Sequence, residues 1–286
     1  MLKGQERYRL RGLLVGFTLL GFSLLNLWTP GLARAGNIGL TGHDDDFHAF
    51  FGGTSSEASA QLKALTQFAR DGSVLPVLTF DSRAELTSAL GALLIPFVNI
   101  DPNNSLLVTD SLFNHSVYSA FIVASDRSCG GCDNSPTGEA NIAAHGTAIG
   151  NFLNAGGGIV GLSGAFSPNY YSFVPQTASA VGGAPTIGYS ATGLFGIPAV
   201  NGDQTHNLFW NPGTHGESAF FQVAEVNSFG NGTVPGPRAA ATLVCLHCTI
   251  SGGVIGGGGT VPEPASLLLL GSGLVGLAAW RLKKLA

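Results

Sequence analysis

Charged side chains are scarce in this chain of 286 residues, of which 10% are Asp, Glu, Lys or Arg. Basic residues are scarcest in the middle, because only five Lys or Arg lie between Gly36 and Val261 against fifteen Asp or Glu. Proteins that bind a nucleic-acid backbone need Lys and Arg to neutralise the phosphates. The central chain is therefore excluded from that class, and no nucleic-acid partner is expected.

Apolar residues and glycine are plentiful, at 45% hydrophobic residues and 42 Gly. A chain of this length can bury a sizeable core in one large domain or two small ones. With so few charges, the surface must consist mainly of Ser, Thr, Asn and Gly. Such a surface suits an exported protein.

The first 35 residues have the three parts of a secretory signal peptide. Basic residues at the start are followed by an apolar stretch from Gly12 to Trp28, then by Pro30 and the small-residue site at Ala33 and Ala35. This pattern predicts cleavage by signal peptidase after Ala35. The alternative is an uncleaved N-terminal membrane anchor.

The C-terminus predicts a membrane helix behind a flexible linker. The linker is the Gly-rich stretch 251–260, and the apolar segment 265–280 follows it. As a helix this segment is about 24 Å long, short for a hydrocarbon core of about 30 Å. The basic residues after it favour the cytoplasmic side, which places the central chain outside.

The last 26 residues resemble a known sorting signal. Pro262, Glu263 and Pro264, the apolar helix and the basic tail (261–286) stand in the order of the PEP-CTERM signal of Gram-negative bacteria. The resemblance implies recognition and removal by an exosortase, a transient hold in the inner membrane, and release to the cell surface or the extracellular space. It also implies association with extracellular polysaccharide. An ordinary C-terminal anchor is the alternative.

The central chain alternates strand and helix patterns, which predicts an α/β domain over residues 36–250 with a doubly wound, mainly parallel sheet. The strands expected are 37–42, 74–80, 118–125, 158–165, 218–226 and 239–246. The helices expected are 54–70 and one opening at Ser82, both behind capping boxes, and 139–154. Between 167 and 198 we expect loops and short extended pieces.

Two short stretches resemble the ThuA-like branch of the class I glutamine amidotransferase-like superfamily, whose sheet is of the flavodoxin type. They are "FLNAGGGIVGLSGA" (152–165) and "NGDQTHNLF" (201–209). Amidotransferases place a cysteine nucleophile on the turn where this chain has Ser163. The resemblance implies a hydrolase or amidase in which His206 or His215 serves Ser163 as base. The alternative is that Ser163 has no catalytic role and is a small residue packed in a tight turn.

An acidic segment follows the first predicted strand, at the sheet edge where α/β folds bind ligands. Two imidazoles and three carboxylates fall within six residues: His43, Asp44, Asp45, Asp46 and His48. This mixture suits a divalent transition metal better than Mg²⁺ or Ca²⁺. The alternative is a solvated acidic loop. No other cofactor is expected.

The four cysteines form two CxxC pairs, Cys129 with Cys132 and Cys245 with Cys248. Export to an oxidising compartment favours disulfides, within each pair or between the pairs. A tetrathiolate zinc site and a redox-active pair are the alternatives. The long gap between the pairs disfavours the zinc site, and the absence of a thioredoxin-like helix start after Cys132 disfavours the redox-active pair.

Three aromatic residues, Tyr170, Tyr171 and Phe173, lie in a Gly- and Pro-rich stretch. Exposed rings there would suit a sugar contact, and buried rings would cover one end of the sheet. Three functions stay open at this point. They are a non-enzymatic exported surface or matrix protein, a hydrolase or amidase, and a metal- or glycan-binding module.

Overall fold

A computed structural model provides the fold of the central chain. It describes residues 35–126, 133–164, 170–175, 178, 180–210, 220–231, 233–234, 236 and 239–250. All of these belong to one compact unit that reaches to Ser251. The predicted signal peptide up to residue 34, with Ala33, lies outside the described residues, as do the predicted linker and the sorting segment with Pro262, Glu263 and Pro264. Within the described ranges, no helix has the length and apolar content needed to cross a membrane; the helix expected at 265–280 is outside them.

Five strands form the parallel half of the sheet, in the order β3-β2-β4-β5-β1. They are β1 (Ile38–Thr41), β2 (Val77–Phe80), β3 (Phe97–Ile100), β4 (Ala120–Val123) and β5 (Gly158–Gly161). Four of them lie inside predicted strands. All but β3, which forms the edge, are buried along their whole length. Continuous apolar runs of this kind are typical of strands covered on both faces.

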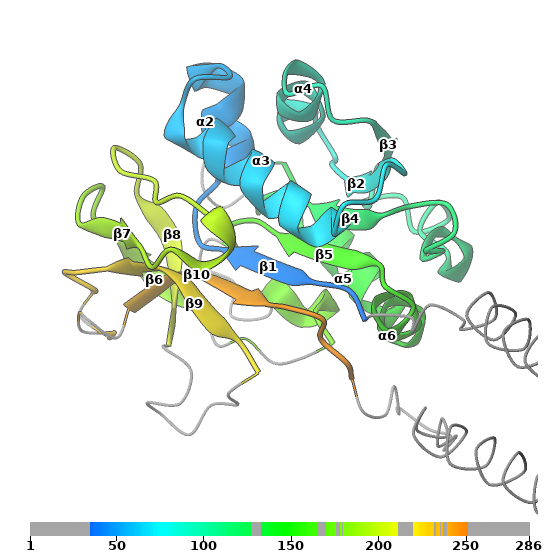
Figure 1. The fold of residues 1–286 in the computed structure, drawn as a ribbon. Coiled ribbons are helices and arrows are strands. Elements are labelled where there is room, and N and C mark those ends of the chain that lie inside the picture. The colour runs from blue at the N-terminus through cyan, green and yellow to red at the C-terminus, as the bar shows by residue number, and fades with distance from the viewer. Residues whose placement is uncertain are drawn as a thin grey trace, which may run out of the picture. The chain divides into compact units, whose positions relative to one another are not determined.

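Helices cover both faces of this half, as predicted. The helices are α2 (Asp45–Gly52), α3 (Glu57–Arg70), α4 (Glu85–Ala92), α5 (Pro136–Ala143) and α6 (Gly146–Asn154). Side chains alternate along β4, so Ala120 and Ile122 pack with α3 and α4, while Phe121 and Val123 pack with α5 and α6. In Figure 1, α2, α3 and α4 lie above the strands and α5 and α6 below them.

The other half of the sheet is antiparallel, so the prediction of a mainly parallel sheet is wrong there. Strand β10 (Ala239–Cys245) pairs antiparallel with β1, β8 and β9, β8 pairs with β6, and β9 with β7. Their bounds are β6 (Ala180–Ala184), β7 (Tyr189–Ala191), β8 (Thr205–Trp210) and β9 (Gln222–Asn227). All seven residues of β10 are buried. A buried run of this kind reads the same whether its neighbours are parallel or antiparallel.

The aromatic residues of the stretch after β5 are buried, so they offer no sugar contact. Tyr170, Tyr171 and Phe173 are at most 4% exposed and belong to the core with α5 and α6. The Tyr171 hydroxyl donates to the Thr41 carbonyl at 2.9 Å, and the Tyr170 hydroxyl donates to the Ala124 carbonyl. These rings cover the carboxyl end of the central strands.

Both ends of the domain lie at the amino edge of the parallel strands. Ile38 of β1 pairs with Cys245 of β10, and the Cys248 amide donates to the Gly36 carbonyl at 2.9 Å. Cys245 and Cys248 form a disulfide with each other, not with the other pair. Cys129 and Cys132 lie outside the described residues.

Candidate metal centre

The segment between β1 and α2 is held between two other strands. The Ser163 amide, after β5, donates to the His43 carbonyl at 3.0 Å, and the His206 amide, on β8, donates to the Gly42 carbonyl at 2.8 Å. A Cβ atom at position 42 would lie 1.8 Å from the Asn207 carbonyl oxygen. Glycine is therefore required there, because it lets the segment pack directly against β8.

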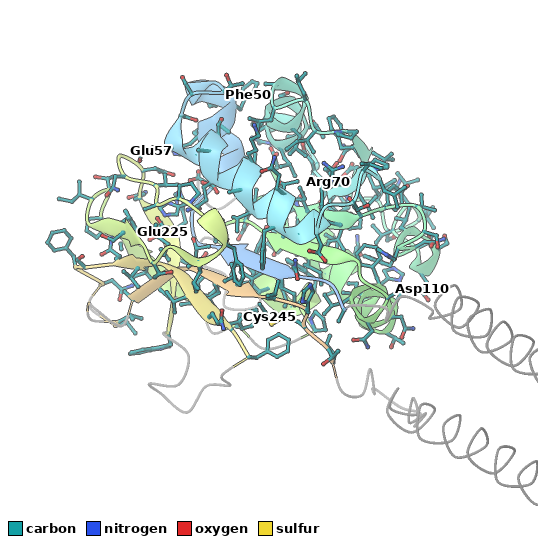
Figure 2. All side chains as sticks on the ribbon, viewed as in Figure 1. Phe50, Glu57, Arg70, Asp110, Glu225 and Cys245 are labelled. Atoms are coloured by element: carbon teal, nitrogen blue, oxygen red, sulfur yellow. A yellow bond between two sulfur atoms is a disulfide. The ribbon has the colours of Figure 1, made fainter. Side chains whose placement is uncertain are left out.

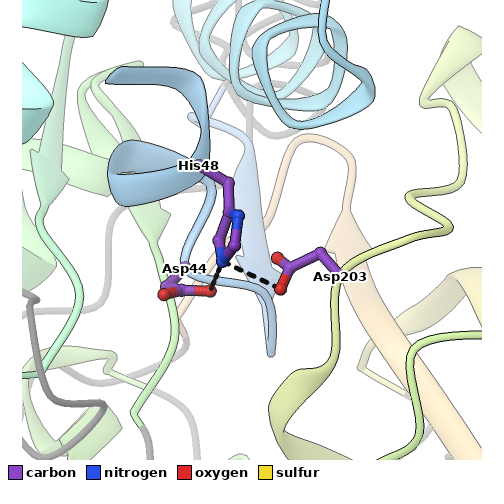
Figure 3. Close-up of side chains that lie close together, drawn as sticks. All are labelled: Asp44, His48 and Asp203. Atoms are coloured by element: carbon purple, nitrogen blue, oxygen red, sulfur yellow. Dashed lines mark ion pairs between the residues drawn. The ribbon is translucent and has the colours of Figure 1, made fainter. Parts of the chain in front are cut away.

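Three potential metal ligands converge just after this segment (Figure 3). Asp44, His48 and Asp203 each offer one ligand atom, and these atoms lie within 4.8 Å of one another. His48 Nε2 lies 3.6 Å from Asp44 Oδ1 and 3.0 Å from Asp203 Oδ1. Asp44 and His48 meet because residues four apart share one face of a helix, and Asp203 is brought in from the segment before β8. The three come from two regions far apart in sequence.

His206 lies against the same group. Its Nε2 lies 3.2 Å from Asp44 Oδ1, and both side chains are nearly buried. Burial raises the pKa of Asp44, and the contact with His206 opposes that rise. A metal ion at this oxygen would compete with proton binding, since a carboxylate must be ionised to act as a ligand.

His43 stands behind the ligands as a buried cation. Its Nδ1 lies 3.8 Å from Asp203 Oδ2 and its Nε2 lies 3.4 Å from Glu225 Oε2. Burial alone would lower the pKa of His43, but the Glu225 and Asp203 carboxylates outweigh it and raise that pKa to about 10. In turn, His43 and His48 overcome the effect of burial on Asp203 and lower its pKa to about 2.

Glu225 on β9 is fixed by neutral donors as well as by His43. Its carboxylate accepts from the Val200 amide at 2.8 Å, from Gln61 Nε2 at 2.9 Å and from Thr242 Oγ1 at 2.7 Å. Burial opposes ionisation here, but His43 first, and then the hydrogen bonds from Thr242 and Val200, lower the pKa of Glu225. The buried pair of His43 and Glu225 thus fixes the position of the Asp203 carboxylate.

Of the five predicted residues, the structure places only Asp44 and His48 in the group that could hold a metal ion. Helix α2 begins at Asp45, so Asp45 and Asp46 turn into the interior and are fully buried. Asp46 accepts from the Ser125 amide at 2.8 Å and from its hydroxyl at 2.6 Å, and neither oxygen of Asp45 has a hydrogen-bond partner among the described residues. The picture of a solvated acidic loop is also wrong, because all of Asp44, Asp45 and Asp46 are at most 2% exposed.

Ser163 and His206 lie on opposite sides of the Gly42–His43 segment. The Ser163 side chain is fully buried, and His206 Nε2 faces Asp44. His215, the other base considered, lies outside the described residues. The catalytic pair of Ser163 with a histidine stays a prediction.

A pocket of about 370 Å³ opens beside the three ligands. His48 and Asp203 lie on its wall, together with Phe51 of α2, Glu57 of α3 and Asn201. Figure 2 shows Glu57 at the start of α3 and Glu225 among the late strands. A metal ion held by three protein atoms here would keep open positions toward this pocket.

Two residues of the centre, Asp203 and Glu225, were not predicted. Asp203 carried a signal, since it stands three residues before His206 in the stretch 201–209 that was singled out for its resemblance. Glu225 carried none, because a single carboxylate within a predicted strand looks like any surface residue. Only folding reveals that it is fully buried.

Comparison with known proteins assigns the C-terminus. A model of the PEP-CTERM protein-sorting motif matches residues 260–284. The motif implies an exported protein that passes through the membrane toward the cell surface and is processed by an exosortase. No curated protein and no solved structure matches the chain significantly. No family match supports the resemblance to the ThuA-like branch.

Proposed function

We propose that this exported protein binds a divalent transition metal through Asp44, His48 and Asp203. The observation that carries the proposal is the convergence of the three ligand atoms within 4.8 Å from two distant segments. One imidazole with two carboxylates is a ligand set for Zn²⁺ and similar ions, whereas Mg²⁺ and Ca²⁺ prefer oxygen alone. His206 positions Asp44, and His43 with Glu225 positions Asp203.

The role we propose is binding, with no covalent step at Ser163. Ser163 is fully buried, and the Gly42–His43 segment lies between it and His206. This favours the non-enzymatic, exported protein over the hydrolase. Because His48 and Asp203 line the pocket, a metal ion held by them would have coordination positions open toward it. Such an ion could bind a further ligand as well as stabilise the fold.

Metal analysis of the purified full chain tests the proposal. After loading with Zn²⁺ and dialysis we expect about one Zn²⁺ per chain, and a loss of at least about tenfold in affinity for Asp203→Asn and for His48→Ala, the range seen when a metal site loses a supporting contact. Absence of stoichiometric binding of Zn²⁺, Co²⁺, Ni²⁺ or Mn²⁺ would overturn it.

A matched control exists in the chain. Asp110 pairs with His145 at 2.6 Å, an aspartate–histidine contact with no third ligand beside it among the described residues. In Figure 2 Asp110 is well separated from Glu57 and Glu225. Asp110→Asn removes a carboxylate of the same kind, and it should leave Zn²⁺ binding unchanged.

A further inference from the structure

Exposed aromatic rings stand at the pocket beside the metal ligands. Phe51, on the pocket wall, is 68% exposed, and its neighbour Phe50 is 45% exposed with ring centroids 4.8 Å apart. Phe47 packs against Phe51 at 4.7 Å and against His48 at 5.3 Å. Helix α2 thus carries the His48 ligand and an outward aromatic surface together, and an exposed ring offers a flat apolar face to C–H groups.

The polar wall of the pocket favours a ligand that donates hydrogen bonds. Glu57 Oε2 accepts from the Asn201 amide at 2.6 Å, which fixes this carboxylate in place. A carboxylate oxygen has capacity for further donors. No Lys or Arg is among the described residues that line the pocket. Glu57 and Asp203 both add negative charge to this wall, and the one histidine that lines it, His48, would be engaged by the metal, so a neutral ligand is favoured over an anionic one.

The inner wall of the pocket belongs to the metal site. His48 and Asp203 both line it, so a bound ion would meet the ligand through open coordination positions. A neutral molecule that fits this wall must offer oxygen lone pairs to the ion. A ligand that fits the whole pocket is therefore a small molecule with neighbouring oxygen atoms, O–H donors and a face of C–H groups.

We propose that this pocket binds a saccharide ring. Two neighbouring hydroxyl groups coordinate the metal, another donates to Glu57, and the C–H face of the ring packs on Phe51. The inference rests on the proposed metal binding and adds the ligand class. The aromatic contact with the sugar is made by the exposed ring of Phe51, because Tyr170, Tyr171 and Phe173 are buried.

Saturation-transfer NMR tests the proposal with defined probes. The full chain, purified in a detergent without sugar groups and loaded with Zn²⁺, is mixed with the methyl glycosides of mannose, galactose and glucose. We expect transfer to the C–H protons of at least one glycoside, with a dissociation constant of about 1–10 mM, as expected for a ligand of this size. EDTA should abolish the transfer.

Two variants test separately what the Phe51 ring and the Glu57 carboxylate contribute to glycoside binding. Phe51→Ala should weaken glycoside binding by about tenfold and Glu57→Gln by several-fold, with Zn²⁺ binding unchanged in both. The control is Phe229→Ala, because Phe229 is 59% exposed and lies just after β9, outside the pocket. It should bind glycosides like the parent protein.

The outcomes distinguish the two proposals. If Zn²⁺ binds but no glycoside receives saturation, or if EDTA or Phe51→Ala leaves glycoside binding intact, the saccharide inference is wrong and the metal proposal stands. If Zn²⁺ itself does not bind, the proposed function fails, and the inference fails with it.

Discussion

Two groups of buried acids in this domain have pKa values shifted in opposite directions. In the first, the histidine group, Asp203 and Glu225 both face His43, and the pKa of each is lowered, that of Asp203 to about 2. In the second, the carboxylate group, Asp133 lies beside Glu85 and Glu139 faces Asp126. Burial and these like charges raise the pKa of Asp133 to about 11 and that of Glu139 to about 9.

The difference shows that burial by itself does not decide whether an acid is ionised. Desolvation opposes ionisation of Asp203, Glu225, Asp133 and Glu139, and of these four only the two that lie next to His43, Asp203 and Glu225, overcome it. A metal needs ionised ligands, so of these acids Asp203, which also contacts His48, is suited to hold one, whereas the raised pKa values of Asp133 and Glu139 favour bound protons.

Removing the buried cation should have the largest effect. His43→Ala removes the cation between the Glu225 and Asp203 carboxylates, which leaves Glu225 with neutral donors alone and Asp203 with His48, and we expect the metal-free protein to lose about 3–5 kcal/mol of unfolding free energy. Thermal unfolding measures this as a fall of roughly 10 °C in Tm.

A second substitution checks the cause. Glu225→Gln in the His43→Ala background removes the unpaired charge and should recover part of the loss. If the double variant is no more stable than His43→Ala alone, the histidine group is not held together by charge.

Ser125→Ala should have an intermediate effect, because the pKa of Asp46 lies between the lowered values of the histidine group and the raised values of the carboxylate group. Burial raises the pKa of Asp46 to about 7, and the hydrogen bonds from Ser125 limit the rise. Without the hydroxyl that pKa should rise further, so the variant loses stability over a wider range as pH increases. We expect about 1–2 kcal/mol of destabilisation at pH 8 and less at pH 5. Equal destabilisation at the two pH values in urea unfolding would contradict this account.

Glu139→Gln should have the smallest effect, and it should stabilise. The folded pKa of about 9 lies above the ordinary value of 4.5, so wild-type stability falls as pH rises between these values. Glutamine mimics the protonated acid, so Tm should rise by roughly 3 °C at pH 8, which corresponds to about 1 kcal/mol, and should not change at pH 4. A variant less stable than wild type at pH 8 would show that Glu139 is ionised in the fold.

Most of the parallel half of the fold followed from the sequence, because four of its five strands lie in predicted strands that alternate with helix patterns. Two strands were missed for physical reasons. Strand β3 is a partly exposed edge, and β8 carries the polar residues Thr205, His206 and Asn207 inward, against the usual pattern of a buried strand. The pairing of β10 was not predictable, since strand direction depends on contacts far apart in sequence.

The site was half predictable. Asp44 and His48 belong to both the predicted set and the group that converges in the structure, but the same sequence pattern included Asp45 and Asp46, which helix α2 turns inward. Local sequence does not specify which residues of a run face the interior until the helix start is known. Asp203 and Glu225 reach the centre only through the antiparallel half, whose arrangement was not foreseen.

The most direct test of the central claim is anomalous diffraction at the zinc edge from crystals of the Zn²⁺-loaded protein. We expect one strong peak about 2.0–2.2 Å from an oxygen of Asp44, from His48 Nε2 and from an oxygen of Asp203, with further density on the pocket side. A peak elsewhere in the domain, or a Zn²⁺-soaked crystal with no peak at these three residues, would contradict the claim.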